Sequence, residues 1–312
     1  MIFSCRFRLR GCRFTGLKIA STSQIDTSMR MKNNIKKRLV KINGFITSKK
    51  KPSLKSIHQL RLEVKHLEAF TELMAVQHNF SARSAIPDRL EKLFNKAGKL
   101  RKFELESGAI QSITKNKSLR KPTRFLQELN LYKKKSSKQL RKKRKSYHPL
   151  TIKEFAKHAD AKLSSHTWQQ FLASRASSIL DLLAQDIMAD IRSLHQLRKI
   201  LKSILYVTPL CKKGVKPVRV LLKTNRRFIK NVESSIGSLH DTDYFVSWVE
   251  KKHNIIHASE EKALIKIKQE WQNDIKHMME KLEPMMPAIR QIALDLKDHS
   301  PDNLNSAIGM FN

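Results

Sequence analysis

The stretch that decides the fold occurs twice in the chain: residues 56–61 read SIHQLR, and residues 193–198 read SLHQLR. A lysine follows each arginine four residues later, so both copies contain the pattern His-x-x-Arg-x-x-x-Lys, and every matched position is offset by 137 residues. The repetition indicates that one helical unit is used twice. The shared cationic side chains are His58, Arg61 and Lys65 in the first copy and His195, Arg198 and Lys202 in the second.

A helix through either copy would carry two distinct stripes. Successive residues lie about 100° apart on a helix, so the three cationic side chains of each copy fall within about 60° of one another. An apolar stripe lies one residue earlier in both copies: Ile57, Leu60, Val64 and Leu67, then Leu194, Leu197, Leu201 and Ile204. Each helix is therefore expected to bury its apolar stripe and to present a cationic stripe beside it. Because the copies agree in residue type and phase, a shared binding role explains them better than a solvated basic face.

Composition narrows the fold class and the kind of partner. The 312 residues include 63 Lys and Arg against 27 Asp and Glu, a formal net charge of +36, with 40% hydrophobic residues and only 8 Gly and 9 Pro. Few turn residues and frequent helical spacing of apolar residues predict an all-α protein. A surface so positive attracts polyanions. Nucleic acid, inorganic polyphosphate, an anionic membrane and polyphosphorylated small molecules all remain candidates on charge alone.

The cysteines and the hydropathy indicate which cellular environment fits the chain. The chain has three cysteines, Cys5, Cys12 and Cys211, with no Cys-x-x-Cys spacing. Neither a disulfide framework nor a zinc knuckle is therefore expected, which fits a reducing cytoplasm. No run approaches the roughly 18 apolar residues of a membrane-spanning helix. We expect no membrane span, no metal site and no cofactor.

The chain is expected to consist of one domain with two similar halves. Residues 1–30 are basic and are expected to be a disordered extension, residues 31–300 form the domain, and residues 301–312 are a tail. The halves cover about 31–148 and 149–300, and Gly98 and Gly237 recur at an offset of 139. This spacing favours two antiparallel bundles related by a pseudo-two-fold axis over a solenoid. Helices are expected at 31–46, 53–78, 87–106, 119–145, 152–161, 168–184, 186–207, 215–235, 241–253, 258–282 and 286–297.

The repeated pattern resembles the CHAD family, the conserved histidine α-helical domain. In that family each half carries one His-x-x-Arg-x-x-x-(Arg/Lys) helix followed by a Gly-Asp turn, which residues 236–241 (IGSLHD) resemble, whereas Lys102 stands where the first turn would have its Asp. The resemblance implies two helical bundles facing each other across a basic central groove. It also implies binding of inorganic polyphosphate without catalysis, and a cytoplasmic location that includes polyphosphate granules.

The proposed site follows from the chemistry of these side chains. Arg61 and Arg198 offer planar forks to phosphate oxygens, Lys65 and Lys202 act as point charges, and His58 and His195 each donate one N–H. If these imidazoles become protonated, binding should tighten from pH 8 to pH 6; if neighbouring cations keep them neutral, the pH profile should be flat. Further cations on the helix expected at 215–235 either extend the track or form a solvated face: Lys223, Arg226, Arg227 and Lys230.

Two other functions stay open at this point. A sequence-nonspecific nucleic-acid-binding protein could use the same cations together with residues 133–145, where nine of thirteen residues are Lys or Arg. That run is either an electrostatic arm or a solvated, disordered segment. With only 7% aromatic residues, platforms for stacking single-stranded bases are not evident. An enzyme acting on phosphoanhydrides is the third possibility, but no acidic metal cluster accompanies the cations.

Overall fold

The computed structural model describes residues 22–78, 86–155, 164–210, 216–251 and 258–299. Within these ranges every regular element is a helix, so the all-α prediction is confirmed. None of the described helices combines the length and apolar character required to cross a bilayer. The α-helices are α1 (Thr22–Thr47), α2 (Leu54–His78), α3 (Asp88–Asn116), α4 (Thr123–Lys145), α6 (Ser165–Leu183), α7 (Ile191–Val207), α8 (Lys216–Lys251), α9 (Ala258–Leu282) and α10 (Met286–Asp298). Short 3-10 turns are η2 (Ile187–Ala189), η3 (Thr208–Leu210) and η6 (Glu283–Met285).

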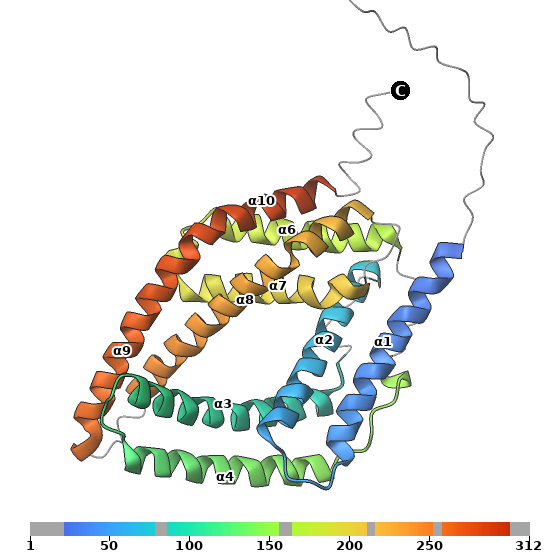
Figure 1. The fold of residues 1–312 in the computed structure, drawn as a ribbon. Coiled ribbons are helices and arrows are strands. Elements are labelled where there is room, and N and C mark those ends of the chain that lie inside the picture. Colours follow the sequence, from blue (N-terminus) through green and yellow to red (C-terminus); the bar gives the residue numbers. More distant parts are fainter. Residues whose placement is uncertain (1–21, 79–85, 156–163, 211–215, 252–257, 300–312) are drawn as a thin grey trace, which may run out of the picture.

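The helices are arranged in layers along the four sides of a frame (Figure 1). Along successive sides, α1 packs on α2, α3 on α4, and α8 on α9, while α6 packs on both α7 and α10. The inner helices are α2, α3, α7 and α8, and the other helices lie outside them. Both copies of the repeated sequence are therefore on inner helices, α2 and α7, which contact each other.

The predicted apolar stripes are confirmed as core. On α2 and on α7, all four apolar positions of the stripe are at most 2% exposed. The largest hydrophobic cluster joins these stripes with residues of α1, α3, α6, α8 and α10. A second cluster lies where α3, α4, α8 and α9 meet, and it includes Phe125, Trp248 and Trp271. Each cluster draws on residues from both halves of the chain, so the halves share their cores.

Several helix boundaries differ from the sequence-based expectation. The helices expected at 215–235 and 241–253 are one continuous helix, α8, and the Gly-Asp turn expected at residues 236–241 is helical. Likewise α3 continues through Gly98 to Asn116. A helix tolerates an isolated glycine at a cost of about 1 kcal/mol, so glycine alone does not end it.

The structure also bears on two segments for which disorder was considered, residues 133–145 and residues 1–30. The run at 133–145 belongs to α4, so it is ordered as helix. The helix α1 begins at Thr22, within the expected extension. Residues 1–21, 156–163 and 300–312, which cover the rest of that extension, most of one expected helix and the tail, lie outside the described residues.

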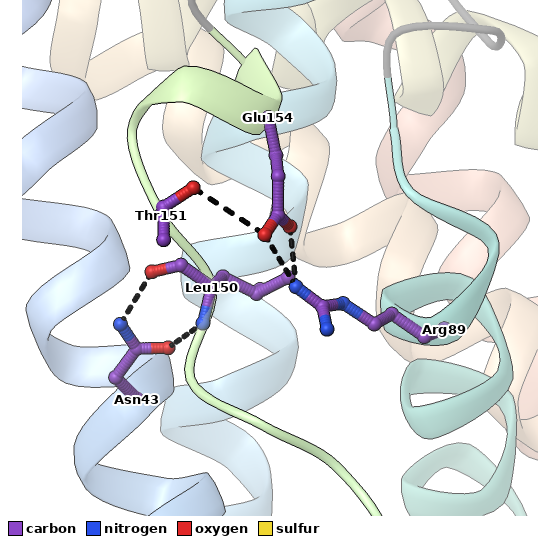
Figure 2. A network of polar contacts seen from close by, with 5 residues as sticks. All are labelled: Asn43, Arg89, Leu150, Thr151 and Glu154. Carbon is purple, nitrogen blue, oxygen red and sulfur yellow. Dashed lines mark hydrogen bonds and ion pairs between the residues drawn. The ribbon is translucent and has the colours of Figure 1, made fainter.

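The segment that joins the two halves is fixed by polar contacts (Figure 2). Asn43 on α1 pairs with the backbone of Leu150: its Nδ2 donates to the carbonyl at 2.8 Å, and its Oδ1 accepts from the amide at 2.7 Å. Nearby, Arg89 on α3 donates to Glu154 Oε1 at 2.6 Å, and the Thr151 hydroxyl donates to the same oxygen at 3.3 Å. The connection is thus tied to both α1 and α3.

Candidate functional site

A cavity of about 800 Å³ is lined by residues of the four inner helices. All six cationic residues of the repeated pattern line it, three from α2 and three from α7. The lining includes seven lysine and arginine side chains and four acidic ones. The cations are Arg61, Lys65, Arg101, Lys102, Arg198, Lys199 and Lys202, and the acidic residues are Glu68, Glu72, Glu233 and Asp241.

Each repeated arginine lies directly against a glycine of the neighbouring inner helix. A methyl group on Gly98 of α3 would lie 2.6 Å from Arg61 Nη1, and one on Gly237 of α8 would lie 2.8 Å from Arg198 Nη2. Real Cβ atoms do not approach other atoms so closely. The two glycines that were expected to form turns therefore serve another purpose, which is to let the guanidinium groups approach the helices closely.

On the first side, an aromatic ring holds the two cations. Arg61 Cζ lies 4.1 Å and Lys65 Nζ lies 5.1 Å from the centroid of the Phe94 ring, both within the range of cation–π attraction. Arg61 Nη1 also donates to the Phe94 carbonyl at 3.2 Å. Lys65 in addition forms an ion pair with Glu68 at 2.6 Å. Apart from that pair, these contacts position positive charge without neutralising it.

On the second side, one carboxylate holds the corresponding cations. Glu233 Oε1 lies 3.0 Å from Arg198 Nε and 3.1 Å from Lys202 Nζ. Burial and the charge of Arg198 lower the pKa of Lys202, while Glu233 opposes this shift. The carboxylate therefore keeps a partly buried lysine and arginine next to each other.

The histidines of the pattern are held in their neutral form. Burial, and then the charge of Arg101, lowers the pKa of His58. Burial, and then the charge of His240, whose ring centroid is 4.1 Å away, lower the pKa of His195 to about 4. Protonation of these rings between pH 8 and pH 6 is therefore disfavoured, and the flat pH profile becomes the expectation in place of tighter binding at pH 6.

Some lining residues were not singled out from the sequence. Arg101 lies three residues after Gly98, on the same face of α3, and its positive charge lowers the pKa of both His58 and Lys202. Arg101 lines the same cavity as both motif helices. At the offset of 139 residues, Arg101 corresponds to His240 in the second half. This correspondence between the halves is the sequence signal that could have identified Arg101 as a lining residue. Lys199 on α7 and Tyr244 on α8 also line the cavity.

The four cations predicted to extend the track do not line the cavity. Lys223, Arg226, Arg227 and Lys230 are exposed on α8, nearer its N-terminus than the lining residue Glu233. At 100° per residue they occupy the same stripe of α8 as Glu233 and Gly237. They form an exposed continuation of that stripe outside the cavity.

Comparisons of the chain with protein-family models, curated proteins and solved structures find no match. In the part of the chain that the structure describes, no group of three or more His, Cys, Asp or Glu side chains is arranged to hold a metal ion.

Proposed function

We propose that this chain binds inorganic polyphosphate, without catalysis, in the cavity between the four inner helices. The proposal includes a CHAD-like organisation, with two pseudo-symmetric helical bundles around a basic central groove. The observation that carries it is the convergence of both His-x-x-Arg-x-x-x-Lys copies, 137 residues apart, on a single cavity. Two copies of a binding unit on one cavity suit a ligand whose own chemical groups repeat.

The lining chemistry matches a chain of phosphates. Guanidinium groups make paired, charge-assisted hydrogen bonds to phosphate oxygens, and lysine ammonium groups add mobile positive charge. Seven such cations line a volume of about 800 Å³. Neutral His58 and His195 can still each donate one N–H. A linear polyanion that neutralises several of these cations would release counterions, so its affinity should fall steeply with salt.

Two observations favour polyphosphate over nucleic acid. The cavity of about 800 Å³ has the size of a small-ligand pocket, and a single phosphate chain is much narrower than a nucleic-acid duplex. Two of the aromatic rings that line it are also covered on one face by cations: Arg61 Cζ lies 4.1 Å above the Phe94 ring, and Lys102 Nζ lies 3.7 Å above the Tyr244 ring. These cations compete with bases for the ring faces, whereas polyphosphate has no bases to stack.

Binding without hydrolysis agrees with the pairing of three of the four carboxylates of the cavity with cations of the protein. Glu68 pairs with Lys65, Glu233 pairs with Arg198 and Lys202, and Glu72 pairs with Arg175 of α6 at 2.8 Å. Each of these carboxylates is thus engaged by a cation of the protein. Phosphate release from polyphosphate in the presence of Mg²⁺ is expected to stay at the level of a protein-free control.

A competition assay tests the choice of ligand. Labelled long-chain polyphosphate is bound to the protein and displaced with unlabelled polyphosphate, duplex DNA or single-stranded RNA at equal phosphate concentration and equal salt. We expect unlabelled polyphosphate to displace the label at the lowest concentration. Displacement by either nucleic acid at a tenfold lower concentration would contradict the proposal and favour nucleic-acid binding.

A further inference from the structure

The two sides of the cavity can be compared position by position, because α3 and α8 correspond at an offset of 139 residues. Four residues before each glycine stand Phe94 on α3 and Glu233 on α8. Three and four residues after each glycine, α3 carries Arg101 and Lys102, and α8 carries His240 and Asp241. All six residues line the cavity. At these matched positions α3 supplies two cations, whereas α8 supplies two carboxylates.

Two arginines on the α3 side have no ion-pair partner in the part of the chain that the structure describes, and the charge of Glu68 only partly offsets the lowering of the Arg61 pKa by burial and by Arg101. Arg61 lies against Gly98, and Arg101 follows one helical turn further along the same face of α3. Within the described residues, neither arginine forms an ion pair with a carboxylate. Holding guanidinium groups together in this way is unfavourable unless an anion joins them. Clustered arginines without acidic partners are a common arrangement for binding phosphate groups.

Positive charge on the α8 side already has an anion. Glu233 Oε1 contacts both Arg198 Nε and Lys202 Nζ, at 3.0 and 3.1 Å, as a phosphate oxygen would. The Glu233 side chain is only 12% exposed, so its charge is poorly screened by water. A phosphate that approaches Arg198 and Lys202 must therefore displace this carboxylate or lie next to it against electrostatic repulsion.

The remaining charged groups of the lining do not remove this difference. Lys65 is paired with Glu68, and Glu72 is paired with Arg175 outside the cavity. Lys199 is exposed, and Lys102 is held over the Tyr244 ring. The main contrast is that, among the residues described, Arg61 and Arg101 on the α3 side form no ion pair, whereas Arg198 and Lys202 on the α8 side are both paired with Glu233.

We infer that the cavity contains two unequal phosphate subsites, and that Glu233 is the residue that makes them unequal. The stronger subsite is formed by Arg61 and Arg101, with His58 as a neutral donor. The weaker one is formed by Arg198 and Lys202, where Glu233 competes with phosphate. This inference rests on the proposed function and deepens it: a short polyphosphate binds first on the α3 side, and Glu233 limits how many further phosphates engage.

The variant Glu233→Gln tests this inference, because it keeps the size of the side chain and removes its charge. The matched control is Glu270→Gln, which removes one carboxylate from an ion pair with Lys117, on residues that do not line the cavity. Binding of tripolyphosphate is measured by calorimetry at several salt concentrations, and thermal unfolding confirms that each variant is folded. Arg101→Ala is compared with Arg141→Ala, since Arg141 is exposed on α4 away from the cavity.

Opposite effects are expected at the two subsites. Removing a like charge beside a bound phosphate in Glu233→Gln should tighten tripolyphosphate binding about tenfold and steepen its salt dependence. Glu270→Gln should change affinity less than about twofold, because Glu270 does not line the cavity and its charge is partly screened by solvent. Arg101→Ala should weaken binding about tenfold or more, and Arg141→Ala should have little effect.

The outcomes separate this inference from the proposed function. If the wild-type protein binds tripolyphosphate but Glu233→Gln behaves like Glu270→Gln, or binds more weakly, the unequal subsites are refuted while polyphosphate binding stands. Equal losses in Arg101→Ala and Arg141→Ala would likewise refute the arginine subsite alone. A wild-type protein that binds neither tripolyphosphate nor long-chain polyphosphate would overturn both.

Discussion

At the scale of single residues, the contact between each repeated arginine and a helical glycine organises the site. Arg61 and Arg198 lie where the Cβ atoms of Gly98 and Gly237 would otherwise be. The glycines lower helix propensity, so their presence inside α3 and α8 is explained by what they allow to pack on them. The repeated cations could be predicted from the sequence because each triplet shares one stripe of its own helix. The packing of arginine on these glycines could not be predicted, because glycine also commonly ends helices.

Gly98→Ala should weaken polyphosphate binding without much effect on the stability of the fold. Alanine favours a helix over glycine by about 1 kcal/mol, but its methyl group would displace the Arg61 guanidinium. We expect weaker polyphosphate binding, by about tenfold, with little loss of thermal stability. Gly108→Ala is the control on the same helix, because nothing lies within 4 Å of its Cβ position. It should raise stability and leave affinity unchanged; an equal loss of affinity in both variants would rule out the proposed role of Gly98.

The buried histidines predict how stability depends on pH. Mainly through burial, the pKa of His66 and that of His195 are both lowered to about 4 from an ordinary value of 6.5. Between these values the unfolded chain binds protons that the folded protein does not, so unfolding becomes easier as the pH falls from about 6.5 towards 4. Above pH 7 these two residues contribute no pH dependence.

The corresponding measurement is the free energy of unfolding in denaturant at pH 7.5 and pH 5. We expect a decrease at pH 5 in the wild-type protein and a smaller decrease in the double variant His66→Gln/His195→Gln. The difference in the free energy of unfolding between the two pH values is taken within each protein. Any pH-independent effect of the substitutions on stability therefore cancels. An equal decrease in both proteins would show that these histidines titrate normally in the fold.

At the scale of elements, the long continuous helices were harder to predict than the helical class. Apolar spacing predicted most helices, including both motif helices and their buried stripes. The continuity of α8 through Gly237 was missed, because whether a glycine ends a helix depends on tertiary contacts that the local sequence does not contain. For the same reason the sequence did not show where along α8 the cavity ends. The four exposed cations before Glu233 therefore could not be separated from the cavity lining.

A carboxylate from one helix also fixes the beginning of another. Glu260, in the first turn of α9 and 7% exposed, accepts hydrogen bonds from the backbone amides of Arg124 at 2.9 Å and Phe125 at 3.0 Å. These amides belong to the first turn of α4, where helix amides lack internal acceptors. Because Glu260 and α4 are about 135 residues apart in sequence, no local capping pattern could reveal this contact.

Glu260→Ala should destabilise the fold through α4. Loss of a charged cap typically costs about 1–2 kcal/mol, and the two amides would be left without this acceptor. Chemical denaturation measures the change, with Glu280→Gln on the exposed part of the same helix as a control expected to stay within about 0.5 kcal/mol. If the two variants prove equally stable, the cap contributes nothing measurable.

At the scale of the whole molecule, the two halves of the chain are joined rather than separate. Both hydrophobic clusters combine residues from before and after residue 148. The segment that connects the two halves is held by two hydrogen bonds between the Asn43 side chain and the Leu150 backbone (Figure 2). The cavity is lined by α2, α3, α7 and α8, which are the inner helices of the fold (Figure 1). The helices α2 and α7 bring the two cationic triplets to it from opposite halves of the chain. Repetition in the sequence predicted that the triplets would be equivalent, but only the packing of the inner helices shows that they share one cavity.

The most direct test of the central claim compares two double variants with the same loss of charge. Arg61→Ala/Arg198→Ala removes the arginine of each triplet, and Arg120→Ala/Arg141→Ala removes two exposed arginines that do not line the cavity. Affinity for long-chain polyphosphate is measured at fixed salt for both, after circular dichroism has confirmed their helical content. We predict that the first variant loses about a hundredfold in affinity and that the second loses less than about threefold. Equal losses would contradict the account, because they would mean that net charge, and not the cavity, binds the polymer.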